Sequence, residues 1–257
     1  MKELSNLFSV KGKKGFITGA ARGIGKCLAT AFAELGADVA IVDLDIVEAE
    51  KTAVEIAEKY SRKVTAIKCD VTDEEDVAGM MATFMADYGF IDYAINNAGI
   101  VNVIDADKIS SADFKKVVDV NLNGVFITAQ AAAKEMIKSG KGGTIINTAS
   151  MSGHIINKPQ TIANYCASKG GVILLTKALA IEWAQYGIRV NSVSPGYMLT
   201  ELVEQLTDMH PVWTKMVPMN RLGKPEDLIG AYIYLASNAS LYATGTDVVV
   251  DGGYTSL

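Results

Sequence analysis

The chain has 257 residues, of which 49% are hydrophobic and 21% charged, so it can bury a large core within one α/β domain. Its net charge of -5 and its scattered lysines and arginines argue against nucleic acid and against a membrane surface as partners. Three cysteines without metal-ligand spacing indicate free thiols and no metal site, and the lack of a spanning helix or an export signal predicts a soluble, cytoplasmic protein.

Short apolar runs of strand length alternate with longer segments of helical periodicity. Strands are expected at 15–18, 38–43, 64–69, 91–96, 143–148, 188–193 and 246–251. Helices are expected at 23–35, 47–60, 73–88, 111–139, 163–186 and 225–237. This alternation predicts an α/β fold with a single doubly wound, parallel, seven-stranded sheet of the Rossmann type and helices on both faces. Residues 1–257 then form one domain, in which the irregular segment 194–224 is expected to be a lid.

The sequence T-G-A-A-R-G-I-G follows the first predicted strand and leads into the first amphipathic helix. Glycines let the backbone approach a ligand closely, and the positive end of a helix dipole favours a pyrophosphate. A tight strand-to-helix turn would use the same glycines, so the loop alone does not decide between the two interpretations. The loop residues predicted to contact a dinucleotide are Gly19, Arg22, Gly23, Ile24 and Gly25.

The second predicted strand ends in Asp43, 18 residues after Gly25, near the ~20-residue offset at which an acidic residue binds the adenosine ribose. A carboxylate there would repel the extra phosphate of NADP, so we predict NAD, with NADP as the less favoured cofactor. Arg22 argues the other way, because its guanidinium could pair with that phosphate; it could equally be a solvated residue or a partner for Asp43. Asp45 is interpreted as a solvated loop acid.

Several motifs together resemble the short-chain dehydrogenase/reductase family over essentially the whole chain. They are G-x-x-x-G-x-G in the glycine loop, D-V at 70–71, N-N-A-G at 96–99, N-x-x-G at 121–124, the serine at 150, Y-x-x-x-K at 165–169, and S-P-G at 194–196 with Thr200. The segments S-M-S-G-H-I-I-N-K-P-Q and T-G-T-D-V-V-V-D-G-G-Y-T resemble the branch that interconverts polyols and ketoses, such as the mannitol, arabinitol, xylitol and sorbose oxidoreductases. Some members of that branch use NADP, and Asp43 departs from them.

The resemblance implies further cofactor contacts and an assembly. The implied contacts are Asp70 and Val71 at the adenine, Asn97, Ala98 and Gly99 beside the cofactor, Pro195, Gly196, Met198 and Thr200 toward the nicotinamide, and Tyr165 and Lys169. It also implies a homotetramer with contacts through the 225–237 helix and the C-terminal strand.

Tyr165 and Lys169 lie four residues apart, which places them on one face of a helix. Taken alone, such a pair is usually an ordinary surface contact. In the family context the phenol is the acid/base of alcohol oxidation, and we expect the nearby ammonium to lower its pKa into the working range. The catalytic residues are then Asn121, Ser150, Tyr165 and Lys169. Ser150 would bind the reacting oxygen and Asn121 would hold a water beside Lys169, while the spacing to Tyr165 leaves Ser152 as a second candidate serine.

A polar substrate site is expected around the catalytic serine, although any single member could be an ordinary solvated loop residue. Its predicted members are Ser150, Ser152, His154, Asn157, Gln160 and Tyr197. The predicted function is reversible, NAD-dependent oxidation of a secondary alcohol of a polyol to a ketose. The alternatives are an NADPH-dependent reductase of 3-oxoacyl thioesters or a steroid-type dehydrogenase, which the apolar residues of 198–217 favour, and a non-catalytic dinucleotide sensor.

Overall fold

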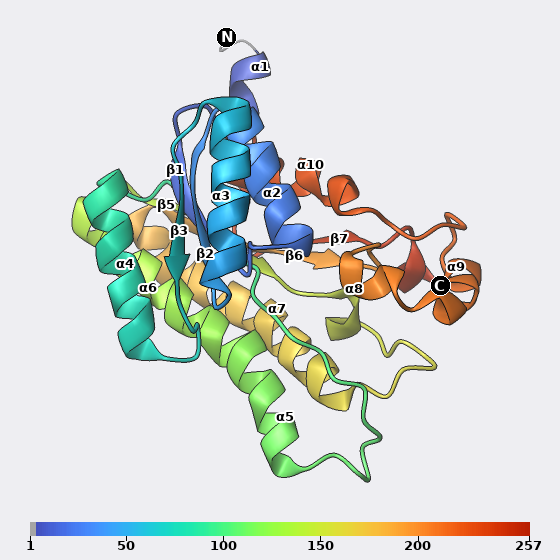
Figure 1. Cartoon of the computed structure of the whole chain (residues 1–257). Helices are drawn as coiled ribbons and strands as arrows, with labels where there is room; N and C mark the ends of the chain where they lie inside the picture. The colour runs from blue at the N-terminus through green and yellow to red at the C-terminus, as the bar shows by residue number, and fades with distance from the viewer. Residues whose placement is uncertain (1–3) are drawn as a thin grey trace.

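The computed structural model describes residues 4–257, and within them seven parallel strands form one sheet (Figure 1). The strands are β1 Lys14–Thr18, β2 Asp38–Asp43, β3 Val64–Lys68, β4 Tyr93–Asn96, β5 Gly143–Thr148, β6 Ile188–Pro195 and β7 Asp247–Val250. Their order is β3-β2-β1-β4-β5-β6-β7. The chain adds β2 and β3 on one side of β1 and then crosses to β4 on the other side, so the predicted doubly wound fold is confirmed.

Helices cover both faces of the sheet because side chains alternate along each strand. The helices are α1 Leu4–Leu7, α2 Gly23–Glu34, α3 Ile46–Tyr60, α4 Glu74–Tyr88, α5 Ser111–Val118, α6 Gly124–Ser139, α7 Ala163–Trp183, α8 Glu201–Glu204, α9 His210–Met216 and α10 Ile229–Ala236. On β1, Ile17 packs into the core with α2, α3 and α10, whereas Phe16 packs into the core with α4, α6 and α7 (Figure 1). Among the described helices, none is both long and apolar enough to cross a membrane.

The helix expected at 111–139 is interrupted by a π-helical turn, Asp119–Asn123, between α5 and α6. A π turn accommodates one additional residue without ending the helix, so the apolar periodicity does not reveal it. The turn carries Asn121, whose side chain is completely buried. The interruption therefore lies at one of the predicted catalytic residues.

The irregular segment 194–224 is partly helical and packs through an aromatic cluster. It contains α8, a 3₁₀ turn at Thr207–Met209 and α9. The rings of Tyr197 and Trp213 stack with centroids 4.6 Å apart, and the Tyr254 ring meets Tyr197 edge-on at 5.6 Å. The C-terminal residues thus fix the base of this segment beside the carboxyl end of β6.

Tyr93 provides a test of the core between β4 and β2. Its side chain is completely buried and its hydroxyl donates a hydrogen bond of 2.9 Å to the backbone oxygen of Asp38. We expect Tyr93→Phe to lower the free energy of unfolding by about 1 kcal/mol, because the carbonyl loses its donor without gaining access to water. Urea unfolding followed by circular dichroism measures this. The control is Tyr242→Phe, at a fully exposed ring, and equal stability losses in both variants would contradict the account.

Candidate active site

A cavity of about 1250 Å³ lies at the carboxyl ends of the strands. Because all seven strands are parallel, the loops that follow them meet at this edge, and the reversal of strand order between β1 and β4 opens a crevice there. The predicted site residues that line the cavity are Gly19, Arg22, Gly23, Ile24, Asp43, Asp70, Val71, Asn97, Ala98, Gly99, Ser150, Tyr165, Lys169, Pro195, Gly196, Met198 and Thr200. Residues separated by more than 150 positions in the sequence therefore share one cavity.

The glycine loop provides a site that fits an anionic group. Gly19 and Gly23 have positive φ angles of +62° and +58°, and a Cβ on Gly19 would lie 2.8 Å from the Cα of Ala98. The first turn of α2 has no acidic residue, and its N-cap, Arg22, makes no side-chain capping bond. The first backbone N–H groups of α2 are thus free of a side-chain cap beside the cavity, which suits a pyrophosphate.

Gly25 does not line the cavity, although the sequence placed it among the cofactor contacts. A Cβ at this position would lie 2.2 Å from the backbone oxygen of Gly19 and 2.6 Å from the Cα of Ala20. Gly25 is therefore required for the close packing of α2 against its own preceding loop.

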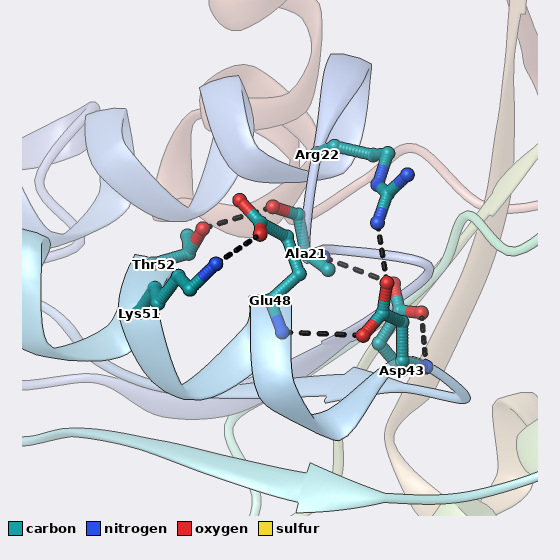
Figure 2. Close-up of polar contacts among 7 residues, drawn as sticks. Ala21, Arg22, Asp43, Glu48, Lys51 and Thr52 are labelled. Carbon is teal, nitrogen blue, oxygen red and sulfur yellow. Dashed lines mark hydrogen bonds and ion pairs between the residues drawn. The ribbon is translucent and has the colours of Figure 1, made fainter.

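The acidic residues at the end of β2 are arranged differently from the expectation (Figure 2). Asp43 accepts hydrogen bonds of 3.0 Å from the backbone N–H groups of Ala21 and Asp45. Arg22 does not pair with Asp43; its Nη2 lies 2.5 Å from Oδ2 of Asp45. Asp45 is therefore the partner of the loop arginine rather than only a solvated acid. The sequence signal was present, as a second acid two residues beyond the strand end, but the sequence does not indicate which acid the arginine reaches.

Tyr165 and Lys169 occupy adjacent turns at the start of α7 and both line the cavity. Lys169 Nζ lies 5.7 Å from the centroid of the Tyr165 ring and donates a 2.7 Å hydrogen bond to the backbone oxygen of Thr148. Ser150 follows β5, and its Oγ accepts a hydrogen bond of 3.1 Å from the backbone N–H of Ser152. The phenol, the ammonium and the hydroxyl of Ser150 thus come from two elements that meet at one wall of the cavity.

Asn121 lies behind this wall and does not line the cavity. Its Oδ1 accepts a 2.8 Å bond from the N–H of Ile100, and its Nδ2 donates to the oxygen of Ile100 at 2.9 Å and to Ser168 Oγ at 3.1 Å. A Cβ on Gly99 would lie 3.3 Å from Asn121 Oδ1 and 3.5 Å from Lys169 Nζ. The glycine therefore leaves a gap that both polar groups border.

Burial dominates the ionisation of Tyr165 and Lys169. It raises the pKa of the Tyr165 phenol, although the hydrogen bond with Ser150 acts in the opposite direction. It also lowers the pKa of Lys169 to about 8. The expected lowering of the tyrosine pKa by Lys169 is therefore not what this structure shows, because the loss of hydration raises the pKa of the buried phenol.

Most of the predicted substrate residues bond to other parts of the protein instead of lining the cavity. His154 Nε2 lies 2.7 Å from Asp247 Oδ2 on β7, and the Tyr197 hydroxyl donates to Gln160 Oε1 at 2.6 Å. Ser152 and Asn157 are buried. Ser150 alone among the predicted substrate residues lines the cavity. The segment 151–160 turns toward β7 and the aromatic cluster, and local spacing cannot reveal that direction.

The structure adds polar side chains at the outer part of the cavity that the sequence reasoning missed. They are Lys115, Lys116, Asp119, Glu201 and Gln205. They come from α5, the π turn and the region of α8, and they carry no motif. Only the packing of these helices determines which of their turns face the cavity.

Known proteins match this chain over nearly its full length. A family model described as enoyl-(acyl carrier protein) reductase matches residues 19–255. A sorbose reductase from Candida albicans is 44% identical over 97% of this chain and 89% of its own length, and an NADP-dependent mannitol dehydrogenase from Hypocrea jecorina is 42% identical over 98% and 96%. The crystal structure of a short-chain type dehydrogenase/reductase from Mycobacterium marinum is 51% identical, covers 98% of both chains and gives a TM-score of 0.95. This chain belongs to the short-chain dehydrogenase/reductase family.

The family resemblance drawn from the glycine loop, N-N-A-G and Y-x-x-x-K is thus confirmed. In this short-chain dehydrogenase/reductase, the range that the family model matches includes every residue that lines the cavity.

The buried ammonium of Lys169 makes stability depend on pH. Its pKa is about 8 in the folded chain and about 10.5 in the unfolded chain, so between these values the unfolded state binds more protons and stability rises with pH. We expect wild type to gain about 2 kcal/mol of unfolding free energy relative to Lys169→Met between pH 8 and pH 10. Denaturant unfolding of both proteins across this range measures the gain. If the unfolding free energies of the two proteins changed with pH in parallel, the lowered pKa of the buried Lys169 would be contradicted.

Proposed function

We propose that the chain is a nicotinamide-dinucleotide-dependent oxidoreductase that interconverts a secondary alcohol of a polyol with the corresponding ketose. The observation that carries the proposal is the position of Ser150, Tyr165 and Lys169 in one cavity with the glycine loop. A bound nicotinamide supplies the site that accepts or donates the hydride. The sorbose reductase and mannitol dehydrogenase relatives support the substrate class, since these names describe polyol and ketose chemistry in proteins with more than 40% identity.

In the proposed oxidation, the Tyr165 phenolate removes the proton of the substrate hydroxyl, and in reduction the phenol returns it. The Ser150 hydroxyl donates a hydrogen bond to the same oxygen and stabilises its developing negative charge. The Lys169 ammonium, held by the backbone oxygen of Thr148, stabilises the phenolate. With a pKa of about 8, Lys169 is mostly protonated at neutral pH, where this charge is needed.

NAD is the proposed cofactor, although the mannitol dehydrogenase relative is named for NADP. The carboxylates of Asp43 and Asp45 stand at the end of β2, beside the glycine loop, and Arg22 is already paired there. An additional phosphate on the ribose would enter this acidic environment. The preference thus depends on residues of this chain and not on the names of its relatives.

The same proposal includes the lid and the assembly. The segment 194–224 contributes Met198 and Thr200 to the cavity wall, which supports its assignment as a substrate lid. A homotetramer with contacts through α10 and β7 is supported by the exposed apolar side chain of Val249 on β7, which is an edge strand of the sheet.

A 3-oxoacyl thioester reductase is the second candidate, because the family model is described as an enoyl-(acyl carrier protein) reductase, which also acts on an acyl thioester, and because apolar side chains line the cavity. They are Ile100, Val101, Met198 and Val203. The two candidates differ in cofactor and in substrate polarity, so one assay separates them.

The proposed activity is tested by initial rates of nicotinamide reduction with arabinitol, xylitol, sorbitol and mannitol, each offered with NAD and with NADP. We expect turnover of at least one polyol, with a kcat/KM about tenfold higher for NAD, because the acidic strand end disfavours the extra phosphate. A 3-oxoacyl thioester assayed with NADPH is the control substrate. Activity on the thioester with none on any polyol would reject the proposed substrate class.

The acid/base role of Tyr165 is tested by Tyr165→Phe, which removes the hydroxyl and keeps the ring. We expect kcat/KM to fall at least about a hundredfold while the dinucleotide still binds, because only the proton transfer is lost. Tyr186→Phe, at an exposed ring just beyond the same helix, is the matched control and should retain its rate. If Tyr165→Phe retained most of the turnover, the assignment would be wrong.

A further inference from the structure

Two carboxylates and one guanidinium meet where the glycine loop approaches the end of β2 (Figure 2). The Asp43 carboxylate binds the backbone: one oxygen accepts a hydrogen bond from the N–H of Ala21 and the other from the N–H of Asp45. The Arg22 guanidinium is held by Asp45 at 2.5 Å. Arg22 and Asp43 line the cavity, whereas Asp45 is exposed and does not line it. Among the described residues, the guanidinium therefore forms its hydrogen bond and ion pair with a residue that does not line the cavity.

The position of Asp45 is fixed by the start of α3. It is the N-cap of that helix, and its Oδ1 accepts a 3.2 Å hydrogen bond from the N–H of Glu48. Its Oδ2 remains for Arg22. The neighbouring acid, Glu48, pairs with Lys51 at 3.2 Å and makes no contact with the guanidinium. Asp45 therefore combines a structural bond with one ion pair, and the two bonds use different oxygens.

The glycine loop is tied to the same helix, which keeps the two charges close together. The Thr52 hydroxyl donates a 2.9 Å hydrogen bond to the backbone oxygen of Ala21, and this contact is buried. Arg22 follows directly in the chain. The backbone that carries the arginine thus cannot move away from α3 without breaking a buried bond, and any release of the guanidinium must come from its side chain.

We infer that Asp45 is a specificity-determining residue, which disfavours NADP by holding Arg22. The inference rests on the proposed dinucleotide site. A phosphate on the adenosine ribose would have to share the guanidinium with Asp45 or displace it, and in either case it would lie near the carboxylates of Asp43 and Asp45. NAD makes no such demand. Discrimination between the two cofactors then comes from a repulsive element as well as from an attractive one.

Asp45→Asn separates the two functions of this residue. The amide oxygen can still accept from Glu48, so the cap of α3 is preserved, while the ion pair with Arg22 is lost. Glu48→Gln is the matched control, because it removes a negative charge three residues away that does not contact the guanidinium. Arg22→Gln and the double variant Arg22→Gln/Asp45→Asn complete a double-mutant cycle.

The measurement is calorimetric titration of each full-length protein with NAD and with NADP at fixed salt concentration. We expect Asp45→Asn to bind NADP about tenfold more tightly than wild type and to leave the affinity for NAD within about twofold. Glu48→Gln should leave the ratio of the two affinities unchanged. When Arg22→Gln is already present, adding Asp45→Asn should increase the affinity for NADP only slightly.

Two results would overturn the inference while leaving the proposed function intact. The first result would be that Asp45→Asn binds NADP with the same affinity as wild type while it still binds NAD. The other is a gain of the same size with and without Arg22, which would mean that the acid acts only through its own charge. Failure of every protein to bind NAD would instead overturn the proposed function together with this inference.

Discussion

The cavity depends on hydrogen bonds that join the end of β1 to the end of β4. The Thr18 hydroxyl accepts from the N–H groups of Asn97 and Ala98 at 3.0 Å each, and the Asn97 amide donates to the backbone oxygens of Thr18 and Gly19 at 3.1 Å. These bonds hold the glycine loop against N-N-A-G at the point where strand order reverses. Only glycine fits at position 19 in this contact, because a Cβ would lie 2.8 Å from the Cα of Ala98. Asn97 therefore builds the site as well as lining it.

The second constraint is the charge of Lys169, which the fold buries at a cost to its own stability. One backbone oxygen, that of Thr148, accepts from the ammonium, and burial alone lowers the pKa to about 8. A purely structural residue at this position would be better apolar. The retained lysine is understandable if the phenol of Tyr165 must carry a negative charge during the reaction. In the proposed mechanism, the buried ammonium lowers the stability of the fold and provides a preorganised positive charge beside the phenol.

The sequence predicted the parts of the molecule that depend on local patterns. The strands ending in Thr18 and Asp43, the glycine loop and the pair Tyr165 and Lys169 follow from periodicity, spacing and motif order. Other features depend on side-chain direction across long distances. Three such features leave no periodic signal in the sequence. They are the ion pair of Arg22 with Asp45 instead of Asp43, the pairing of His154 with Asp247, and the π turn around Asn121. Tertiary packing likewise determines the burial of Tyr165, and this burial raises the pKa of the phenol, whereas the sequence predicted a lowered pKa.

The central claim is that this cavity transfers hydride directly from the carbinol carbon of a polyol, with Tyr165 as the base. The most direct measurement uses a polyol deuterated at that carbon, followed by mass spectrometry of the reduced dinucleotide. The account predicts that the reduced nicotinamide formed by wild type carries the deuterium, and that Tyr165→Phe forms almost none of this product in the same time. Reduced nicotinamide without deuterium, or equal deuterium transfer by Tyr165→Phe, would contradict it.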